Sequence, residues 1–330
     1  PAAQGPPSSA PRAPGSILWG AWVDGDAYGD AYDDPPWDLD ALGVFEGNAG
    51  KGVSMLHYGQ FWRSSGVGQP FYPNDHQRVR DRGAIPVLDW NPWDAQAGGA
   101  ATQPDFALGN IIDGDFDAYI ADWAAGARDW GHPLFLRFAH EMNGDWYPWS
   151  EARNGNSPGQ YVAAWRHVHG IFSSVGADNV IWVWSPNASY PGSLPLPGLY
   201  PGDAYVDWVA IDGYNWGTNP DRPEVWRSFM DVIGPTYDEL GAIAPSKPVM
   251  IAETGSTEHG GSKAQWIAQA LADVKSELPR IRAFLWFNWD ADADWSIETS
   301  PAARAAFATG IADPAFAGSE FADLAGDPLG

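Results

Sequence analysis

The stretch that decides the fold is LFLRFAHE, from Leu134 to Glu141. It is mostly apolar and then ends in polar side chains, as expected for a parallel strand that is covered on both faces. Seven other short apolar runs share this form, and stretches with helical periodicity separate several of them. The eight expected strands are Ile17–Trp22, Val53–Tyr58, Ile85–Trp90, Leu134–Glu141, Val180–Pro186, Val206–Tyr214, Pro248–Glu253 and Ala283–Trp289.

The order of these elements predicts an α/β fold, a (β/α)₈ TIM barrel. The clearest helices are expected over 115–130, 158–175, 224–240 and 262–278, with Ser262 as an N-cap. Strand and helix alternating in this way is the barrel pattern, and one barrel with long loops accounts for residues 17–330 as a single domain. Residues 1–16, PAAQGPPSSAPRAPGS, have the composition of a Pro/Ala/Ser linker.

The composition favours a neutral ligand. A net charge of −24 repels nucleic acid and anionic membrane surfaces, and no apolar run approaches the ~20 residues that cross a bilayer. The 20 Trp and 12 Tyr supply flat apolar faces of the kind that stack on sugar rings, although about half are expected in the core. The chain has no Cys, which excludes disulfides and thiolate metal sites.

Polar and aromatic residues gather where the expected strands end. In a (β/α)₈ barrel the carboxyl ends of the strands carry the active site. The groups at these ends are His57 and Tyr58, Asp89 to Asn91, His140 and Glu141, Asp212 to Asn215, Glu253, and Asn288 to Asp290.

Two of these residues, Glu141 and Glu253, end the fourth and seventh strands, which lie on opposite sides of an eight-stranded ring. Glu141 is flanked by Trp146 and Trp149, and an apolar setting raises the pKa of a carboxyl. A protonated carboxyl facing an ionised one is what glycosidic bond cleavage requires, with retention expected if the two are about 5–5.5 Å apart.

Metal and cofactor sites are not predicted. The pair His140–Glu141 lacks the second His of a zinc protease helix, because that position is Gly144. The Asp-rich stretches 24–34 and 290–294 place Pro35 and Pro301 where a calcium loop needs Glu. Neither a P-loop nor a Gly-x-Gly-x-x-Gly helix start is present.

The chain resembles glycoside hydrolase family 26 over roughly Gly15 to Gly310. The motifs that carry the resemblance are RFAHEMNGDWYPW, AWRHVHGIF, DWVAIDGYNW, PVMIAETG and FLWFNWD, in this order. The resemblance implies a retaining enzyme with Glu141 as acid/base and Glu253 as nucleophile.

The resemblance also implies roles for the surrounding residues. His140 would hold the substrate and the nucleophile, Tyr214 would donate to the nucleophile, and Arg137 would support the site. Trp146 would be a sugar platform and Trp286 the floor of the site. Trp90, Asn91 and Trp149 complete the expected substrate-binding set.

Two departures from the family pattern affect the substrate. Mannan-cleaving members usually have His where this chain has Asn91, and a WFWWG-like run where it has WYPWS, 146–150. β-1,4-Mannan is expected as the substrate because it dominates the family, with mixed-linkage β-1,3-1,4-glucan as the alternative.

An inactive carbohydrate-binding barrel is the alternative that is not an enzyme. The presence of both Glu residues together with His140 and Tyr214 favours catalysis. We expect a secreted bacterial protein, monomeric or part of a larger modular enzyme, whose partner is a polysaccharide.

Overall fold

Eight parallel strands close into a barrel in the computed structural model, which describes residues 16–99, 101–218 and 224–322. The closure is made by β1 pairing with both β2 and β9. The predicted linker lies outside the described residues, apart from Ser16. The barrel strands are β1 (Ile17–Val23), β2 (Met55–Ser64), β4 (Ile85–Asp94), β5 (Leu134–Phe138), β6 (Val180–Trp184), β7 (Trp208–Asn215), β8 (Val249–Ser256) and β9 (Ile281–Asn288).

Two short strands lie outside the ring. β3 (Val67–Gly68) pairs antiparallel with the end of β2, and β10 (Phe316–Ala317) pairs parallel with the start of β1. The TIM-barrel prediction is therefore confirmed, and all eight predicted strands are present. Several boundaries differ from the prediction. β2, β4 and β8 continue to Ser64, Asp94 and Ser256. β5 ends at Phe138 and not at Glu141, because the backbone takes a left-handed conformation at Ala139.

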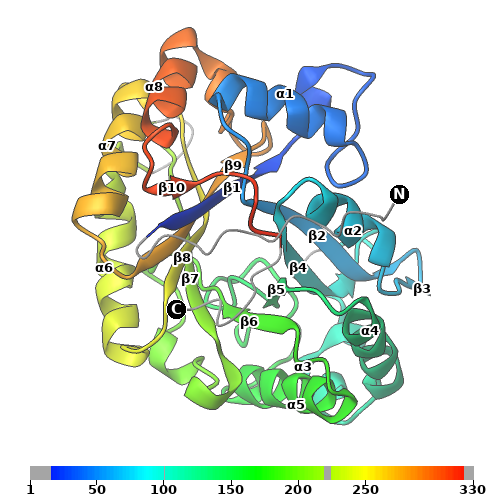
Figure 1. The fold of residues 1–330 in the computed structure, drawn as a ribbon. Helices are drawn as coiled ribbons and strands as arrows, with labels where there is room; N and C mark the ends of the chain where they lie inside the picture. Colours follow the sequence, from blue (N-terminus) through cyan, green and yellow to red (C-terminus); the bar gives the residue numbers. More distant parts are fainter. Residues whose placement is uncertain (1–15, 100, 219–223, 323–330) are drawn as a thin grey trace, which may run out of the picture.

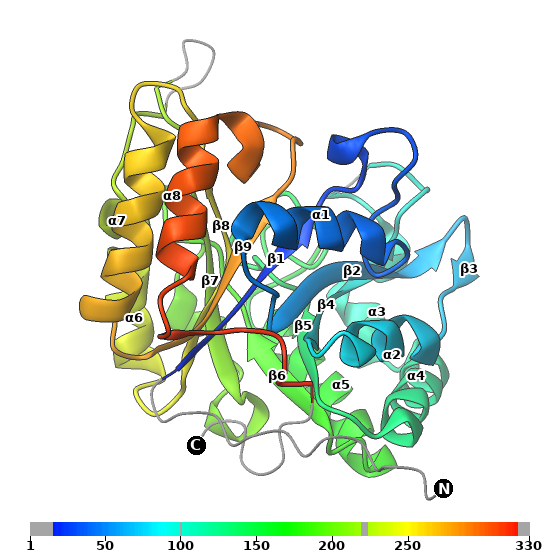
Figure 2. The ribbon, with the colours of Figure 1, turned by 45° about the horizontal axis from the view of Figure 1, so that its top comes forward.

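Helices surround the barrel (Figures 1 and 2). The four predicted helices correspond to α4 to α7, and Ser262 caps α7 by accepting from the backbone N–H of Gln265. No helix in the described ranges has the length and apolar character to cross a membrane. The helices are α1 (Leu39–Ala49), α2 (Pro73–Asp81), α3 (Leu108–Ile112), α4 (Asp117–Trp130), α5 (Gln160–Val175), α6 (Phe229–Ile243), α7 (Lys263–Ser276) and α8 (Pro301–Ile311).

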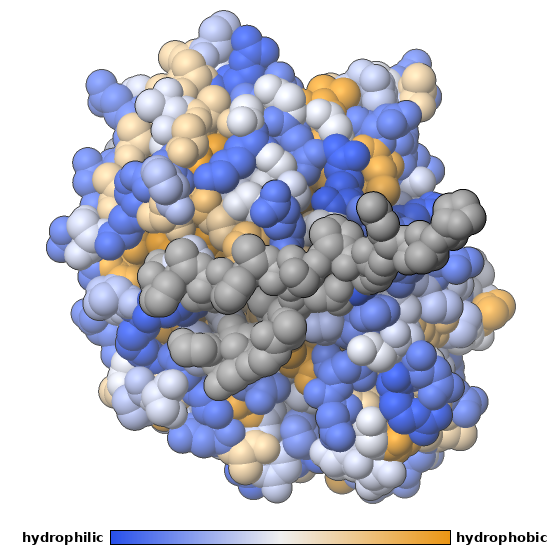
Figure 3. All heavy atoms as spheres, in the orientation of Figure 1, coloured by the Kyte–Doolittle hydropathy of each residue, from blue (hydrophilic) through white to orange (hydrophobic). Residues whose placement is uncertain are grey.

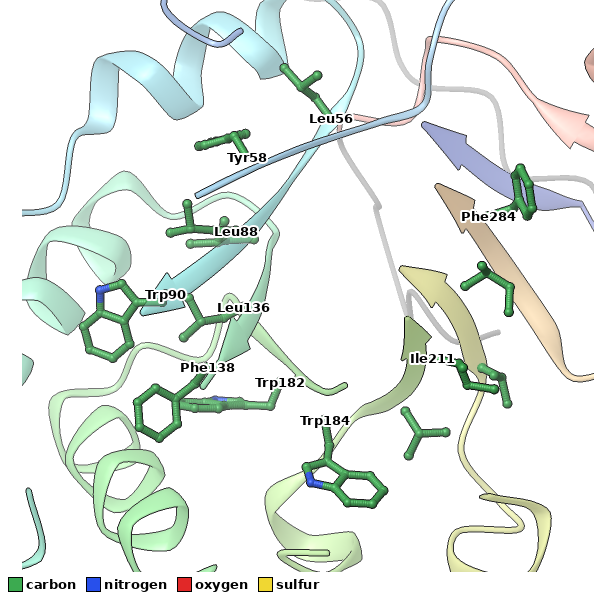
Figure 4. Close-up of a cluster of buried hydrophobic side chains, with 14 of the residues drawn as sticks. Leu56, Tyr58, Leu88, Trp90, Leu136, Phe138, Trp182, Trp184, Ile211 and Phe284 are labelled. Carbon is green, nitrogen blue, oxygen red and sulfur yellow. The ribbon is translucent and has the colours of Figure 1, made fainter. Parts of the chain in front are cut away.

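The strands separate two hydrophobic cores because successive side chains on a strand point to opposite faces. The smaller core fills the barrel and includes Leu18, Val87 and Phe135. The larger core lies between the strands and the helices (Figure 4). The visible outer surface in Figure 3 is mostly hydrophilic, as expected from the composition.

Trp90 belongs to the larger core, so the expectation that it binds substrate is corrected. Its side chain is fully buried and points outward from β4 (Figure 4). The indole packs against Trp123 of α4 and Phe172 of α5, at ring-centroid distances of 4.7 and 5.6 Å. The preceding side chain, Asp89, points into the barrel. Trp90 was predicted to point there too, but consecutive side chains of a strand point to opposite faces.

Truncation of Trp90 should therefore reduce stability. We expect Trp90→Ala to lower the free energy of unfolding by about 3–5 kcal/mol, the usual range for removing a large aromatic side chain from a core. Urea denaturation followed by circular dichroism measures this change. The matched control is Trp37→Ala, because Trp37 is 50% exposed and its loss should change stability by about 0.5 kcal/mol or less. Equal, small effects would contradict a core role for Trp90.

Candidate active site

The carboxyl ends of the strands bring the predicted glutamates together. One carboxylate oxygen from each of Glu141, Asp212 and Glu253 lies within 4.8 Å of the other two. All three side chains are buried. Because they come from β7, β8 and the segment after β5, the closed barrel is what makes these distant parts of the sequence neighbours.

Glu141 reaches this position through an unusual backbone. Ala139 and Glu141 both have positive φ angles, 48° and 51°, a conformation that costs non-glycine residues roughly 1–3 kcal/mol. Hydrogen bonds hold the segment: Glu141 N–H donates to the Ser185 carbonyl at 2.7 Å, and Trp149 Nε1 donates to the His140 carbonyl at 2.7 Å. Because of this backbone conformation β5 ends at Phe138, and the residues after it turn toward the barrel mouth.

A β-bulge places Glu253. The pairing of β7 with β8 changes register between Ile211 and Asp212, so that Ile251 and Glu253 face consecutive residues of β7. Ala252 is the extra residue, and it fills the inner core while Glu253 continues into the site. Bulges of this kind re-aim a side chain. Tyr214 Oη then donates to Glu253 Oε2 at 2.6 Å.

Arg137 lies at the centre of the site and is completely buried. Its Nη1 donates to Asp89 at 2.7 Å and to Glu253 Oε1 at 2.8 Å. Its Nη2 donates to Asp212 and, at 3.0 Å, to Ser185 Oγ. The predicted supporting residue is thus an ion-pair centre that joins four strands or their ends.

Two donors hold the carboxylate of Glu141. Asn187 Nδ2 donates to Oε1 and Trp146 Nε1 donates to Oε2, both at 2.8 Å. The Trp146 indole folds back over Gly144, where a Cβ atom would come within 2.4 Å of the ring. A glycine at this position is what allows the indole to lie against Glu141.

The two glutamates have opposite pKa shifts. Burial and the nearby charge of Glu253 raise the pKa of Glu141 to about 7, against the two hydrogen bonds, which lower it. Burial is the largest influence and acts to raise the pKa of Glu253, but the Arg137 guanidinium together with His57 and His140 holds the pKa below its ordinary value. Near neutral pH, therefore, Glu141 can carry a proton while Glu253 is ionised.

The site also has two sets of groups with metal-ligand chemistry, His57–Asp89–Glu253 and Glu141–Asp212–Glu253. Three of these carboxyls, Asp89, Asp212 and Glu253, already accept from Arg137. A guanidinium in direct contact supplies the positive charge that a cation would bring, and it would repel a metal ion. The donor set therefore fits an organic ion-pair network better than a metal centre.

Two further predicted residues lie beside this network with unused polar atoms. Asn91 follows Asp89 by two residues, so it points to the same face of β4, and it is 7% exposed. Asn91 Oδ1 and His140 Nδ1 are buried without a hydrogen-bond partner among the described residues. Buried polar atoms of this kind are available to a ligand.

Trp286 and Trp149 do not line the site, and their expected contact with substrate is corrected. Trp286 points outward from β9, packs on Phe307 of α8 at 5.5 Å, and is 1% exposed. Trp149 is fully buried beneath Tyr147, with ring centroids 4.4 Å apart. Both indoles belong to the larger hydrophobic core and support the site without lining it.

Two residues of the site, Asn187 and Phe287, were not predicted from the sequence. Asn187 was only the residue after a predicted strand, and no pattern distinguished it. The inward neighbour of Trp286 is Phe287, which lies edge-on to Tyr214 at 5.7 Å and parallel to Trp289 at 6.1 Å. Side chains alternate between the two faces of a strand, and this alternation could have predicted that Phe287, rather than Trp286, faces the barrel interior.

Paired carboxyls at the mouth of a (β/α)₈ barrel are the arrangement on which glycosidic bond cleavage depends, and comparisons agree with it. Residues 94–255 match the family model for glycosyl hydrolase family 26. Endoglucanase H of Acetivibrio thermocellus is 38% identical over 236 residues, which is 71% of this chain and 25% of that protein. A mannan endo-1,4-β-mannosidase of Bacillus subtilis is 27% identical over 57% of this chain and 47% of its own length.

Solved structures show the same fold. The catalytic domain of a family 26 endo-β-1,4-mannanase from Bacillus sp. JAMB-750 has a TM-score of 0.71 and 21% identity, covering 93% of this chain and 88% of that one. The chain belongs to glycoside hydrolase family 26. It spans from a quarter to about half of the length of the curated relatives named above.

The hydrogen bond from Asn187 should set the pKa of Glu141. It favours the charged carboxylate, so Asn187→Leu should raise the pKa by on the order of one unit, since a hydrogen bond to a charged group contributes about 1.5–3 kcal/mol. Glu253→Gln should lower it by removing a nearby negative charge. Carbon-13 NMR of the Glu141 carboxyl, assigned with Glu141→Gln, measures both shifts.

Asn110→Leu is the matched control, because the Asn110 amide donates only to the backbone carbonyls of Pro104 and Asp105 in the described structure. It should leave the titration of Glu141 unchanged. A pKa that moves the same way in all three variants would contradict the assignment.

Proposed function

We propose that the protein is a retaining, endo-acting hydrolase of a β-linked polysaccharide. The observation that carries the proposal is the pair Glu141 and Glu253, with carboxylate oxygens within 4.8 Å and pKa values moved apart by their surroundings. A close pair suits direct attack, whereas an inverting enzyme leaves room for a water between carboxyls about 6.5–9.5 Å apart.

In the proposed mechanism each step is carried by one residue, and the geometry supports this assignment. Glu253 is ionised and attacks the anomeric carbon, while Glu141 gives its proton to the departing oxygen. The glycosyl–Glu253 ester is then hydrolysed by a water whose proton returns to Glu141. Tyr214 and Arg137 hold Glu253 in the orientation for attack, since each hydrogen-bonds a different carboxylate oxygen.

A pH optimum follows from the same two residues. Activity should fall as pH rises through about 7, because Glu141 then loses the proton that it must donate. It should fall at acidic pH when Glu253 becomes protonated, below the ordinary carboxyl range because its pKa is lowered. Both limbs belong to the same reaction, so the profile is bell-shaped.

Two substrates are proposed in order. β-1,4-Mannan comes first, because several curated relatives are named mannan endo-1,4-β-mannosidase. Mixed-linkage β-1,3-1,4-glucan is the second, and two observations support it. The relative that is 38% identical is named an endoglucanase, and Asn91 stands where mannan-cleaving members usually have His.

An extracellular location and a place in a larger modular enzyme belong to the same proposal. A polymer too large to enter a cell has to be cut outside it. The relatives named above are longer than the segments that match, which supports attachment to further modules. A strongly acidic chain that repels nucleic acid is compatible with a neutral polysaccharide as the partner.

Removing either glutamate tests the proposal. Glu253→Ala should abolish hydrolysis of every substrate, because it removes the carboxylate that attacks the anomeric carbon. Glu141→Ala should reduce turnover of polysaccharide about 10²–10⁴-fold, the usual contribution of a general acid. The loss should be smaller on an activated aryl glycoside, whose leaving group needs no proton. Reducing-end release and aryl release measure the two cases.

Circular dichroism should show that both variants are folded. Asp145→Ala is a matched control, because Asp145 is an exposed carboxylate in the loop that also carries Trp146. Near-normal hydrolysis of polysaccharide by either glutamate variant would refute the assignment and leave a binding protein as the better account.

Asn91 is the residue through which we expect substrate choice to be altered. Mannose and glucose differ in the orientation of the 2-hydroxyl, and a buried hydrogen bond left unmade costs about 1–3 kcal/mol. Asn91→His should therefore shift the ratio of kcat/KM values toward mannan, by roughly one order of magnitude. Kinetics on purified mannan and mixed-linkage glucan measure the ratio. A wild-type protein that cleaves mannan efficiently and ignores the glucan would show that Asn91 does not set specificity.

A further inference from the structure

Tyr190 lies beside the acid in a position that the catalytic steps do not use. It belongs to the segment between β6 and β7, whereas Trp146 belongs to the segment after β5. The two rings are nearly parallel, with centroids 6.0 Å apart and an interplanar angle of 23°. Both side chains are only partly buried. Together they form one aromatic surface next to Glu141.

The hydrogen bonding connects this surface to the acid and not to the nucleophile. Trp146 Nε1 donates to Glu141, the residue that protonates the departing oxygen. Glu253, which attacks the other sugar, is held separately by Tyr214 and Arg137. The aromatic surface is therefore attached to the leaving-group side of the site.

The segment that carries Tyr190 is fixed in place before any ligand arrives. Ser189 N–H donates to Thr236 Oγ1 at 2.8 Å, and Ser189 Oγ donates to Glu239 at 3.0 Å. On the other side, Ser193 Oγ donates to the Tyr190 carbonyl at 3.0 Å. A backbone that is held on both sides of Tyr190 needs little further ordering when the ring binds a ligand.

We propose that Tyr190, stacked on Trp146, forms a sugar-binding subsite for the leaving-group end of the polysaccharide. A sugar ring presents C–H groups on its faces, and the apolar face of Tyr190 can pack against them while its hydroxyl remains in water. This subsite rests on the proposed hydrolase function. It would bind a neutral pyranose unit of the departing chain, beyond the sugar whose oxygen Glu141 protonates.

The experiment compares two substrates that differ only on the leaving-group side. One is the polysaccharide that the wild-type protein cleaves. The other is an aryl β-oligosaccharide of the same sugar, whose leaving group is a single nitrophenyl ring. Tyr190→Ala should lower kcat/KM on the polysaccharide roughly three- to tenfold, the range that one aromatic contact supplies. It should leave aryl release unchanged, because that substrate does not reach Tyr190.

Two variants control the comparison. Tyr190→Phe keeps the ring and should behave as wild type on both substrates. Tyr72→Ala removes a partly exposed tyrosine whose hydroxyl donates to Gln69, on the segment before α2, and should change neither activity. Circular dichroism checks that each variant is folded.

The outcomes separate the subsite from other roles. Equal losses on both substrates would mean that Tyr190 supports the catalytic pair, and no loss on the polysaccharide would mean that it binds no sugar. A Phe variant as impaired as the Ala variant would mean that the hydroxyl, not the ring, is what matters. Each of these results overturns the proposal. A wild-type protein inactive on both substrates would instead overturn the hydrolase function.

Discussion

The buried guanidinium of Arg137 is the interaction on which the rest of the site depends. It contacts three carboxylates that approach it from β4, β7 and β8, and without a positive charge between them these groups would repel one another in a medium that screens poorly. Removing one partner from a buried ion pair commonly costs about 3–5 kcal/mol. Here the barrel supplies a rigid frame in which the charges stay paired, and the carboxylates fix the guanidinium in return.

This arrangement also explains how two identical side chains take different roles. Glu253 touches the guanidinium, whereas the hydrogen bonds of Glu141 come from the neutral donors Asn187 and Trp146. A neutral donor supports the carboxylate less than a full positive charge does, so burial prevails at Glu141 and not at Glu253. The chemical asymmetry of the pair thus arises from a difference in partners that are only a few ångströms apart.

The sequence contained enough information for the architecture and for the two glutamates. Eight apolar runs separated by longer segments predict a barrel, and a Glu at the carboxyl end of such a run is expected near the barrel mouth. The assignments of Trp90 and Trp286 were wrong for one reason. A strand end has two faces, and an aromatic residue one position away from the inner face belongs to the outer core.

Other features of the site were outside the reach of sequence reasoning. The bulge at Ala252 and the left-handed backbone at Ala139 are local irregularities with no composition signal. The donation from Asn187 to Glu141 depends on how two loops meet, a contact between residues 46 positions apart. Such contacts follow from the assembled barrel and not from any pattern along the chain.

The positive φ of Glu141 has a consequence for the whole molecule. Only glycine adopts this conformation without a penalty, so the residue that we propose as the proton donor is also one for which the backbone is poorly suited. Its burial beside another acid adds to the cost. Selection for thermal resistance alone would favour replacing it, whereas the proposed acid role requires it. The protein therefore gives up part of its folding stability at one of the two positions where the proposed chemistry depends on a carboxyl group.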